Sequence, residues 1–172
     1  MPKLKNKEHI VQSQLLSWYR TNKRILPWRK LGSNNLPKPY FVLISEFMLQ
    51  QTTVNTVLKK FKEFITLYPS FKKLSTINED KILQIWSGLG YYARAKNLLK
   101  SVKIIKAKYK NIIPHDYNQL ITLPGIGDYT AKAILGIGYN KSVMPIDSNI
   151  ERILARLYGL KKPISSIKKK IF

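Results

Sequence analysis

One acidic residue lies inside the most apolar segment of the chain and could act as a general acid. Glu46 stands between Leu43, Phe47 and Leu49. Burial in such surroundings raises the pKa of a carboxyl group and keeps it protonated. The alternative is a solvated glutamate in the first turn of a helix, where the helix dipole stabilises a negative charge. From these residues alone we favour that alternative.

A second carboxylate lies where a loop meets a helix. Asp147 follows Pro145, and an apolar periodic segment begins at Ile150. Aspartate is one of the preferred N-cap residues of helices, so capping explains this residue without any chemistry. A catalytic role for Asp147 therefore stays open at this point.

Two glycines follow a Leu-Pro pair within residues 123–135, LPGIGDYTAKAIL. Residues 124–127 predict a tight turn, because glycine tolerates the positive φ that such a turn requires. A helix follows from Asp128, and the free N–H groups at a helix start can bind phosphate. An ordinary helix–helix connection would explain the glycines alone. The net charge of the chain favours the phosphate interpretation.

Other stretches combine aromatic, polar and basic residues that suit nucleic acid. Trp28 and Arg29 place a flat ring beside a guanidinium group, although core packing and surface charge are the usual explanation for such residues. Residues 50–53, Gln-Gln-Thr-Thr, form either an exposed face or a polar reading edge. A glycine turn at residues 87–90 precedes two tyrosines and a lysine-striped helix, and aromatic rings beside bases suit a nucleic-acid surface.

The charge of the chain points to a polyanionic partner. Lys and Arg number 31 against 9 Asp and Glu, which gives +22 over 172 residues. Few acids can pair with these bases, so the surface carries a positive field that attracts nucleic acid. A membrane surface is the competing partner, but the bases are spread along the whole chain. Codon bias toward lysine is an alternative source of part of this charge.

The residue types exclude several other classes of protein. The chain has no cysteine, which excludes disulfides, thiolate metal sites and cysteine nucleophiles. No secretory signal is evident, and the apolar run FVLISEFML is interrupted by Ser45 and Glu46. We therefore expect a soluble protein of the cytoplasm, associated with the nucleoid, with no membrane contact.

Apolar spacing of three and four residues predicts helices, and no segment alternates as a strand does. The fold class is therefore all-α. Residues 40–68 form either one long helix or two abutting ones, and Asn78 is a candidate N-cap. Gly136 and Gly138 are expected to end the helix that follows the glycine turn. The remaining helices are expected at about residues 8–21, 81–86, 91–110, 120–123 and 150–160.

Five stretches together resemble the helix-hairpin-helix DNA glycosylases of the endonuclease III superfamily, and within them the MutY-type adenine glycosylases. They are LPWR (26–29), SEFMLQQTTV (45–54), WSGLGYYARAKNL (86–98), LPGIGDYTAKAIL (123–135) and DSNIERILAR (147–156). The second and third stretches are specific to the adenine branch, whereas the hairpin identifies only the superfamily.

The resemblance implies excision of adenine by two carboxylates. Glu46 matches the acid that protonates the leaving adenine, and Asp147 matches the carboxylate that stabilises the cationic sugar. Two carboxylates in different environments can fill these two roles, as in glycoside hydrolysis. Tyr129 and Asn149 match a tyrosine and an asparagine of the same catalytic site.

The resemblance also implies binding of double-stranded DNA that carries adenine opposite 8-oxoguanine or guanine. The matching residues line the base pocket, probe the stack around the opposing base, or grip phosphate through the hairpin backbone. They are Trp28, Arg29, Gln50, Gln51, Thr52, Leu89, Tyr91, Gly125 and Gly127. A wedge and a phosphate grip allow the base to leave the duplex, and affinity should fall steeply with salt.

Tyr129 distinguishes two kinds of glycosylase. The endonuclease III branch carries a lysine at this position, which forms a Schiff base with the sugar. A tyrosine cannot do so, and we therefore expect a monofunctional DNA N-glycosylase. Lys132, one helical turn further on, is a weak candidate for residual lyase activity.

The resemblance implies a six-helix-barrel subdomain and an incomplete second helical subdomain. Residues 29–140 would form the barrel, with the hairpin at about 116–136. Residues 1–28 and 141–172 would belong to the incomplete, cluster-side subdomain, so we expect Trp18 and its neighbours to be exposed. Four family cysteines that hold a [4Fe–4S] cluster, and a further domain, would follow Phe172. We therefore expect no metal ligands and no cofactor in this chain, except a monovalent cation at the hairpin.

The interpretation we favour is a monomeric adenine DNA glycosylase of base excision repair. Ser148 stands where the family usually has glycine, which could alter the turn that holds Asp147. The first alternative is a shortened, inactive helix-hairpin-helix protein that binds DNA without excision. The second is an endonuclease III-like glycosylase with AP lyase activity, which Tyr129 argues against.

Overall fold

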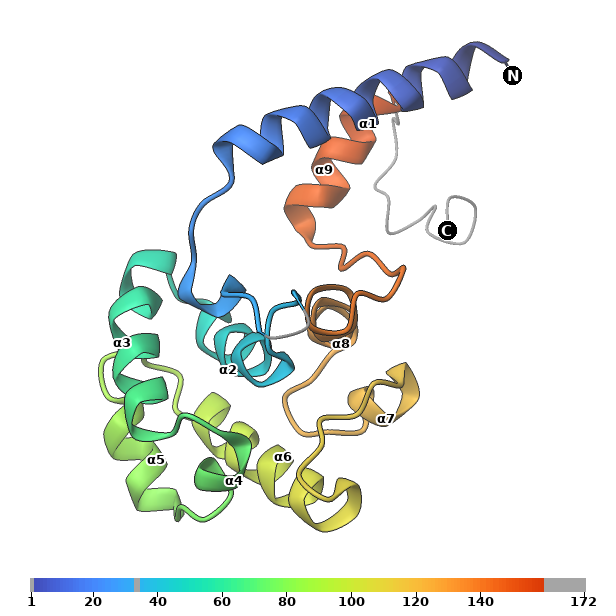
Figure 1. Ribbon diagram of the computed structural model, residues 1–172. Coiled ribbons are helices and arrows are strands. Elements are labelled where there is room, and N and C mark those ends of the chain that lie inside the picture. Colours follow the sequence, from blue (N-terminus) through green and yellow to red (C-terminus); the bar gives the residue numbers. More distant parts are fainter. Residues whose placement is uncertain (1, 33–34, 160–172) are drawn as a thin grey trace.

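The computed structural model describes residues 2–32 and 35–159, and this part of the chain is helical (Figure 1). Its backbone has an isolated bridge between Leu31 and Pro37 but no strand, so the all-α prediction is confirmed for the described residues. The elements are α1 (Pro2–Asn22), the 3₁₀ turn η1 (Pro27–Arg29), α2 (Pro39–Leu49), α3 (Val54–Leu67), α4 (Phe71–Leu74), α5 (Glu79–Trp86), α6 (Ala93–Tyr109), α7 (Tyr117–Ile121), α8 (Asp128–Ala133), the π-helical turn η2 (Ile134–Gly138) and α9 (Ser148–Leu157).

Helix α2 is the centre of the bundle. Its residues 42–48 are all buried, and it packs against η1, α3, α6, α8 and η2. A helix that is hydrophobic on every side is stable in water only when other elements surround it. Pro39 at its first position presets the helical φ and needs no N–H partner there. The most apolar stretch of the sequence is therefore the element that the others cover.

Side-chain caps set several helix boundaries. Residues 40–68 form two helices, because the chain leaves α2 after Leu49 and Thr53 caps α3 by accepting from the Thr56 N–H at 3.4 Å. Asn78 caps α5, as predicted, with 2.9 Å between its Oδ1 and the Lys81 nitrogen. Each such cap satisfies an N–H group that the first helical turn leaves unpaired.

The expectation that Gly136 and Gly138 end the helix after the hairpin holds for Gly138, the last helical residue, but not for Gly136. The backbone stays helical through η2 as far as Gly138. A Cβ atom on Gly138 would lie 3.1 Å from the Pro39 Cα, and one on Gly136 would lie 3.1 Å from the Val143 carbonyl oxygen. These glycines therefore permit close backbone approach, and Gly138 brings η2 against the start of α2.

Helices α1 and α9 both lie away from the main bundle, at the upper end of Figure 1. Trp18 on α1 is 59% exposed, so the predicted exposure of this helix face is confirmed. No residue of α9 is buried. The division into two subdomains stays a prediction, and residues 160–172, expected to belong to the second, lie outside the described residues.

Candidate active site

A cavity of about 390 Å³ lies where η1, α2, α8 and the start of α9 meet. It brings together six of the predicted site residues: Trp28, Arg29, Glu46, Gln50, Tyr129 and Asp147. The other lining residues are Arg24, Leu26, Leu49, Val54 and Thr130. The two carboxylates, which are about a hundred positions apart in the sequence, therefore share one cavity.

Glu46 lies three residues before the last residue of α2, and its carboxyl group has a strongly raised pKa. The residue is 8% exposed. Burial raises the pKa of Glu46 to about 7, and the nearby positive charge of Arg29 opposes this rise. The interpretation that we favoured from the residues alone, a solvated glutamate in a first helical turn, is wrong because α2 begins at Pro39. Glu46 can therefore hold a proton near neutral pH and donate it into the cavity.

The surroundings of Asp147, unlike those of Glu46, favour the ionised carboxylate. The Ile150 N–H donates to its Oδ1 at 2.8 Å, and the Asn149 amide donates to its Oδ2 at 3.1 Å. These hydrogen bonds, led by that from the Ile150 backbone, lower the pKa of Asp147. Asp147 thus caps α9 and also lines the cavity, so the two interpretations of this residue do not exclude each other.

Asn149 does not line the cavity but holds Asp147 from outside. Besides donating to Asp147, its Oδ1 accepts a hydrogen bond from Arg152 at 2.7 Å. This chain of hydrogen bonds fixes the orientation of the Asp147 carboxylate.

Tyr129 is a half-exposed phenol that interacts electrostatically with both acids. Burial raises the pKa of Tyr129, and the negative charges of Glu46 and Asp147 raise it further, while Arg29 lowers it. The hydroxyl therefore stays protonated and can donate a hydrogen bond within the cavity.

The glycine hairpin is packed against α2. Gly125 has φ +80°, and a Cβ atom there would lie 2.7 Å from a ring carbon of Phe47. The Gln50 amide donates to the Gly125 carbonyl at 3.2 Å, and the Ser101 hydroxyl donates to the Pro124 carbonyl at 2.7 Å. Gln50, expected to contact DNA, thus lines the cavity and also ties α2 to the hairpin.

Gly127 differs from Gly125 and corrects the sequence prediction. Its φ of −93° is open to any residue, so only Gly125 uses the positive φ that we expected of the turn. A Cβ atom on Gly127 would meet no atom within 4 Å. This glycine therefore leaves the N-terminal end of α8 uncovered.

Gln51 and Tyr91 lie at the tips of two neighbouring loops, outside the cavity. Both side chains are exposed, and both backbones are left-handed, with φ 54° and 47°. Thr52 is half-buried, and its hydroxyl donates to the Leu89 carbonyl at 3.4 Å. Leu89, expected beside these residues at the DNA, has a side chain that is 4% exposed and packs in the core, and its contact with DNA stays a prediction.

Trp28 is also a core residue, with its ring 5.3 Å from that of Phe61 in an edge-on arrangement. It forms a wall of the cavity, whereas Arg29 is exposed at its edge. Sequence reasoning missed Arg24, which lines the same cavity, since nothing in its spacing sets it apart from the other bases. It also assigned no role to Arg94, which is 6% exposed, although this residue lies within the stretch 86–98 that carries the resemblance.

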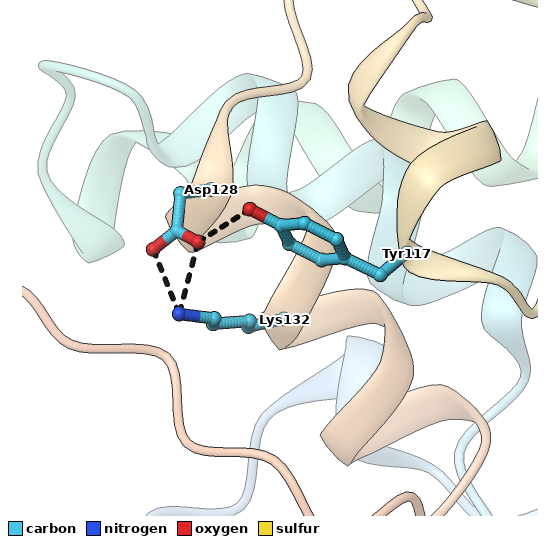
Figure 2. A network of polar contacts seen from close by, with 3 residues as sticks. All are labelled: Tyr117, Asp128 and Lys132. Carbon is cyan, nitrogen blue, oxygen red and sulfur yellow. Dashed lines mark hydrogen bonds and ion pairs between the residues drawn. The ribbon is translucent and has the colours of Figure 1, made fainter. Parts of the chain in front are cut away.

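Lys132 lies away from the cavity. Its ammonium group pairs with Asp128 at 2.9 Å, and the Tyr117 hydroxyl donates to the same carboxylate at 2.7 Å (Figure 2). The geometry therefore does not support the weak candidacy of Lys132 as a lyase nucleophile.

The described residues contain no group of three or more His, Cys, Asp or Glu side chains that could hold a metal ion. The chain has no cysteine thiolate with which to ligate an iron–sulfur cluster. A monovalent cation at the hairpin stays a prediction. Within residues 2–32 and 35–159, no helix is both long enough and apolar enough to cross a membrane.

Comparison with known proteins decides the family. Residues 44–171 match the family model of the HhH-GPD superfamily base excision DNA repair proteins. The chain belongs to this superfamily. Among solved structures, a thermostable thymine-DNA glycosylase of the same fold superimposes with a TM-score of 0.79 at 26% identity, covering 88% of this chain and 68% of that one. A trapped endonuclease III–DNA covalent intermediate gives a TM-score of 0.77 at 21% identity, covering 96% and 75%.

Within the superfamily, the chain is similar to adenine DNA glycosylases, which confirms the resemblance drawn from the motifs. It is 46% identical over 154 residues to that of Buchnera aphidicola from Acyrthosiphon pisum, covering 89% of this chain and 43% of the relative. It is 36% identical to that of Mycobacterium tuberculosis H37Rv, covering 90% and 50%. For the Mus musculus protein the identity is 37%, covering 87% and 30%. The chain thus spans half or less of the length of these relatives.

Proposed function

We propose that this chain is the catalytic part of a monofunctional adenine DNA glycosylase of base excision repair. Its substrate is double-stranded DNA in which adenine is mispaired with 8-oxoguanine or guanine. The observation that carries the proposal is one cavity that holds a carboxyl group with a pKa of about 7, on Glu46, and an ionised carboxylate, on Asp147. Acid–base pairs in separate environments of this kind are typical of glycosidic bond cleavage.

In the proposed reaction, Glu46 donates its proton to a ring nitrogen of the extruded adenine. The glycosidic C–N bond then breaks, and its electron pair leaves with the base. The sugar becomes an oxocarbenium-like cation that the negative charge of Asp147 stabilises. Water adds to the cationic carbon and loses a proton, for which the Glu46 carboxylate is the available acceptor.

Tyr129 supports a monofunctional reaction. The cavity lining includes arginine side chains and Tyr129 but no lysine, and Lys132, outside this lining, pairs with Asp128. Without an amine beside the sugar, no Schiff base forms and the strand is not cleaved. Water is then the only nucleophile that this mechanism uses.

The charge and the hairpin support DNA as the partner. A chain with a formal charge of +22 binds polyphosphates in a salt-dependent manner. The uncovered N-terminal end of α8 at Gly127 suits a backbone phosphate, and the exposed Gln51 and Tyr91 suit contact with the base stack. The cavity volume of about 390 Å³ lies within the range of about 300–1,000 Å³ typical of ligand pockets.

A second candidate is a DNA-binding protein that does not excise adenine. One observation favours it: no residue of α9, the helix that Asp147 caps, is buried. A weakly packed helix would hold the Asp147 carboxylate imprecisely, and small displacements of a reacting group cost large factors in rate.

Single-turnover release of adenine from a duplex with adenine opposite 8-oxoguanine distinguishes the two candidates. We expect release by the parent and loss of release by Asp147→Asn, which keeps the helix cap but removes the charge. Equal duplex affinity of the parent and Asp147→Asn would show that the substitution impairs bond cleavage and not DNA binding. Duplex binding by the parent without any release would overturn the glycosylase proposal and identify the second candidate.

A further inference from the structure

Arg94 is a buried arginine that the proposed reaction does not use. It is the second residue of α6 and is 6% exposed. One guanidinium nitrogen donates to the carbonyls of Phe47 at 3.1 Å and Met48 at 2.9 Å, and also to that of Gln50. These carbonyls belong to the C-terminal end of α2, where helix carbonyls lack intrahelical partners and a positive charge is favoured.

The other guanidinium nitrogen of Arg94 binds the turn that precedes α6. It donates to the carbonyls of Leu89 at 2.9 Å and Gly90 at 3.1 Å. It also donates to the Thr52 hydroxyl at 2.9 Å. The guanidinium carbon lies 5.4 Å from the centre of the Tyr91 ring, within the range of a cation–π contact. One side chain therefore joins two loops that are about forty residues apart.

The residue at the tip of each loop has a strained, left-handed backbone. Gln51, next to the bonded carbonyl of Gln50, has φ 54°, and Tyr91, next to that of Gly90, has φ 47°. A left-handed backbone is unfavourable for a residue other than glycine, and it persists only where the surrounding structure holds it in place. Arg94 holds both residues in this conformation, because its hydrogen bonds fix the Gln50 and Gly90 carbonyls, each immediately before a strained residue.

We propose that Arg94 is a positioning residue that fixes the spacing between the Gln51 and Tyr91 tips and holds both against the end of α2. As regards DNA, the inference rests on the proposed function. Glu46 lies on α2 one residue before Phe47, whose carbonyl accepts from Arg94. The Arg94 side chain therefore also fixes the position of the two tips relative to the cavity. A base leaves the stack productively only when the tips and the cavity act on the same base pair.

Lysine cannot replace Arg94 in this role. The guanidinium group is planar and offers donors in a fixed fork, whereas an ammonium group is a compact point charge with three donors. The acceptors of Arg94 lie on both loops and at the end of α2, so an ammonium group would reach only some of them.

The absence of cysteine from the chain permits a test without DNA. Spin labels are placed on Gln51→Cys and Tyr92→Cys, because both side chains are exposed and this pair leaves the Tyr91 ring in place. The distance distribution between the labels is measured by electron paramagnetic resonance. We expect a single narrow distribution with Arg94 and a clearly broader one in both Arg94→Lys and Arg94→Met, at temperatures where circular dichroism shows the same helix content.

The matched control is Arg20→Met, which removes one positive charge from an exposed position on α1 and should leave the distribution narrow. The lysine variant keeps the charge, so it tests the geometry if the methionine variant does not fold. An unchanged distribution in folded Arg94→Lys would overturn the inference.

A second readout links the positioning to the reaction. Single-turnover adenine release should fall at least about tenfold in Arg94→Lys, and adding Gln51→Ala should then cost little more, since coupled residues are not additive. Fully additive losses would contradict the inference. If no protein of the series releases adenine while the distances behave as expected, the proposed function fails and the positioning role of Arg94 stands.

Discussion

Burial of Glu46 makes the stability of this protein depend on pH in a specific way. The folded-state pKa of about 7 lies above the ordinary value of 4.5, so between these values the folded chain binds more protons than the unfolded chain. The free energy of unfolding must therefore fall as pH rises through this range. The contribution of Glu46 is fully present below pH 4.5 and is lost above pH 7.

The magnitude follows from the two pKa values. A difference of 2.5 pKa units corresponds to about 3 kcal/mol over the whole range. About 2.5 kcal/mol of this is lost between about pH 5 and about pH 8, because part of the titration lies below pH 5. The substitution Glu46→Gln removes the titrating group while keeping nearly the same volume, so the variant should lack this dependence.

Urea denaturation of parent and Glu46→Gln at about pH 5 and about pH 8 measures the effect, with slopes compared to exclude a change in the unfolded state. We expect the variant to gain about 2.5 kcal/mol relative to the parent from the lower to the higher pH. The control is Glu63→Gln on α3, whose carboxylate is exposed and pairs with Lys60. A stability difference between Glu46→Gln and parent that is the same at both pH values would refute the burial argument.

Three further results are expected. Gly125→Ala should lower the free energy of unfolding in urea by about 1–3 kcal/mol, because Gly125 has φ +80° and lies against Phe47. Gly127→Ala should lower it by less than about 0.5 kcal/mol, and equal losses for the two variants would contradict this account of the hairpin. Trp18→Ser, on the exposed face of α1, should change the free energy of unfolding in urea by less than about 0.5 kcal/mol, and a large loss of stability would show that Trp18 packs. Duplex affinity in fluorescence anisotropy should fall at least about a hundredfold between about 50 and 200 mM salt, and a flat dependence would exclude binding through phosphates.

Local sequence features predicted much of the fold because their causes are local. Spacing of apolar residues is sufficient to place α5 and to indicate helix over residues 40–68, though not to divide that segment into α2 and α3, and Asn78 caps α5 as its residue type indicates. Asp147 was recognised as a helix cap for the same reason. Each of these interactions joins residues only a few positions apart, so the local sequence is enough to predict it.

What could not be predicted depends on contacts between distant segments. Glu46 has the same neighbours in sequence whether α2 is exposed or buried, and only the helices around α2 decide its pKa. Gly138 looks like a simple helix terminator, and only the fold reveals that it also lets η2 approach Pro39 closely. Arg94 looks like one of many surface bases, because its acceptors at the end of α2 lie more than forty positions away in the sequence.

The central claim, that Glu46 protonates adenine, is tested most directly by single-turnover release of adenine at about pH 6, with parent and Glu46→Gln on the same mispaired duplex. General acid catalysis is worth about 10²–10⁴ in rate, so the variant should be slower by at least about a hundredfold while binding the duplex equally well. The parent rate should also fall above pH 7, as the carboxyl group ionises. Equal rates of parent and variant would contradict the claim.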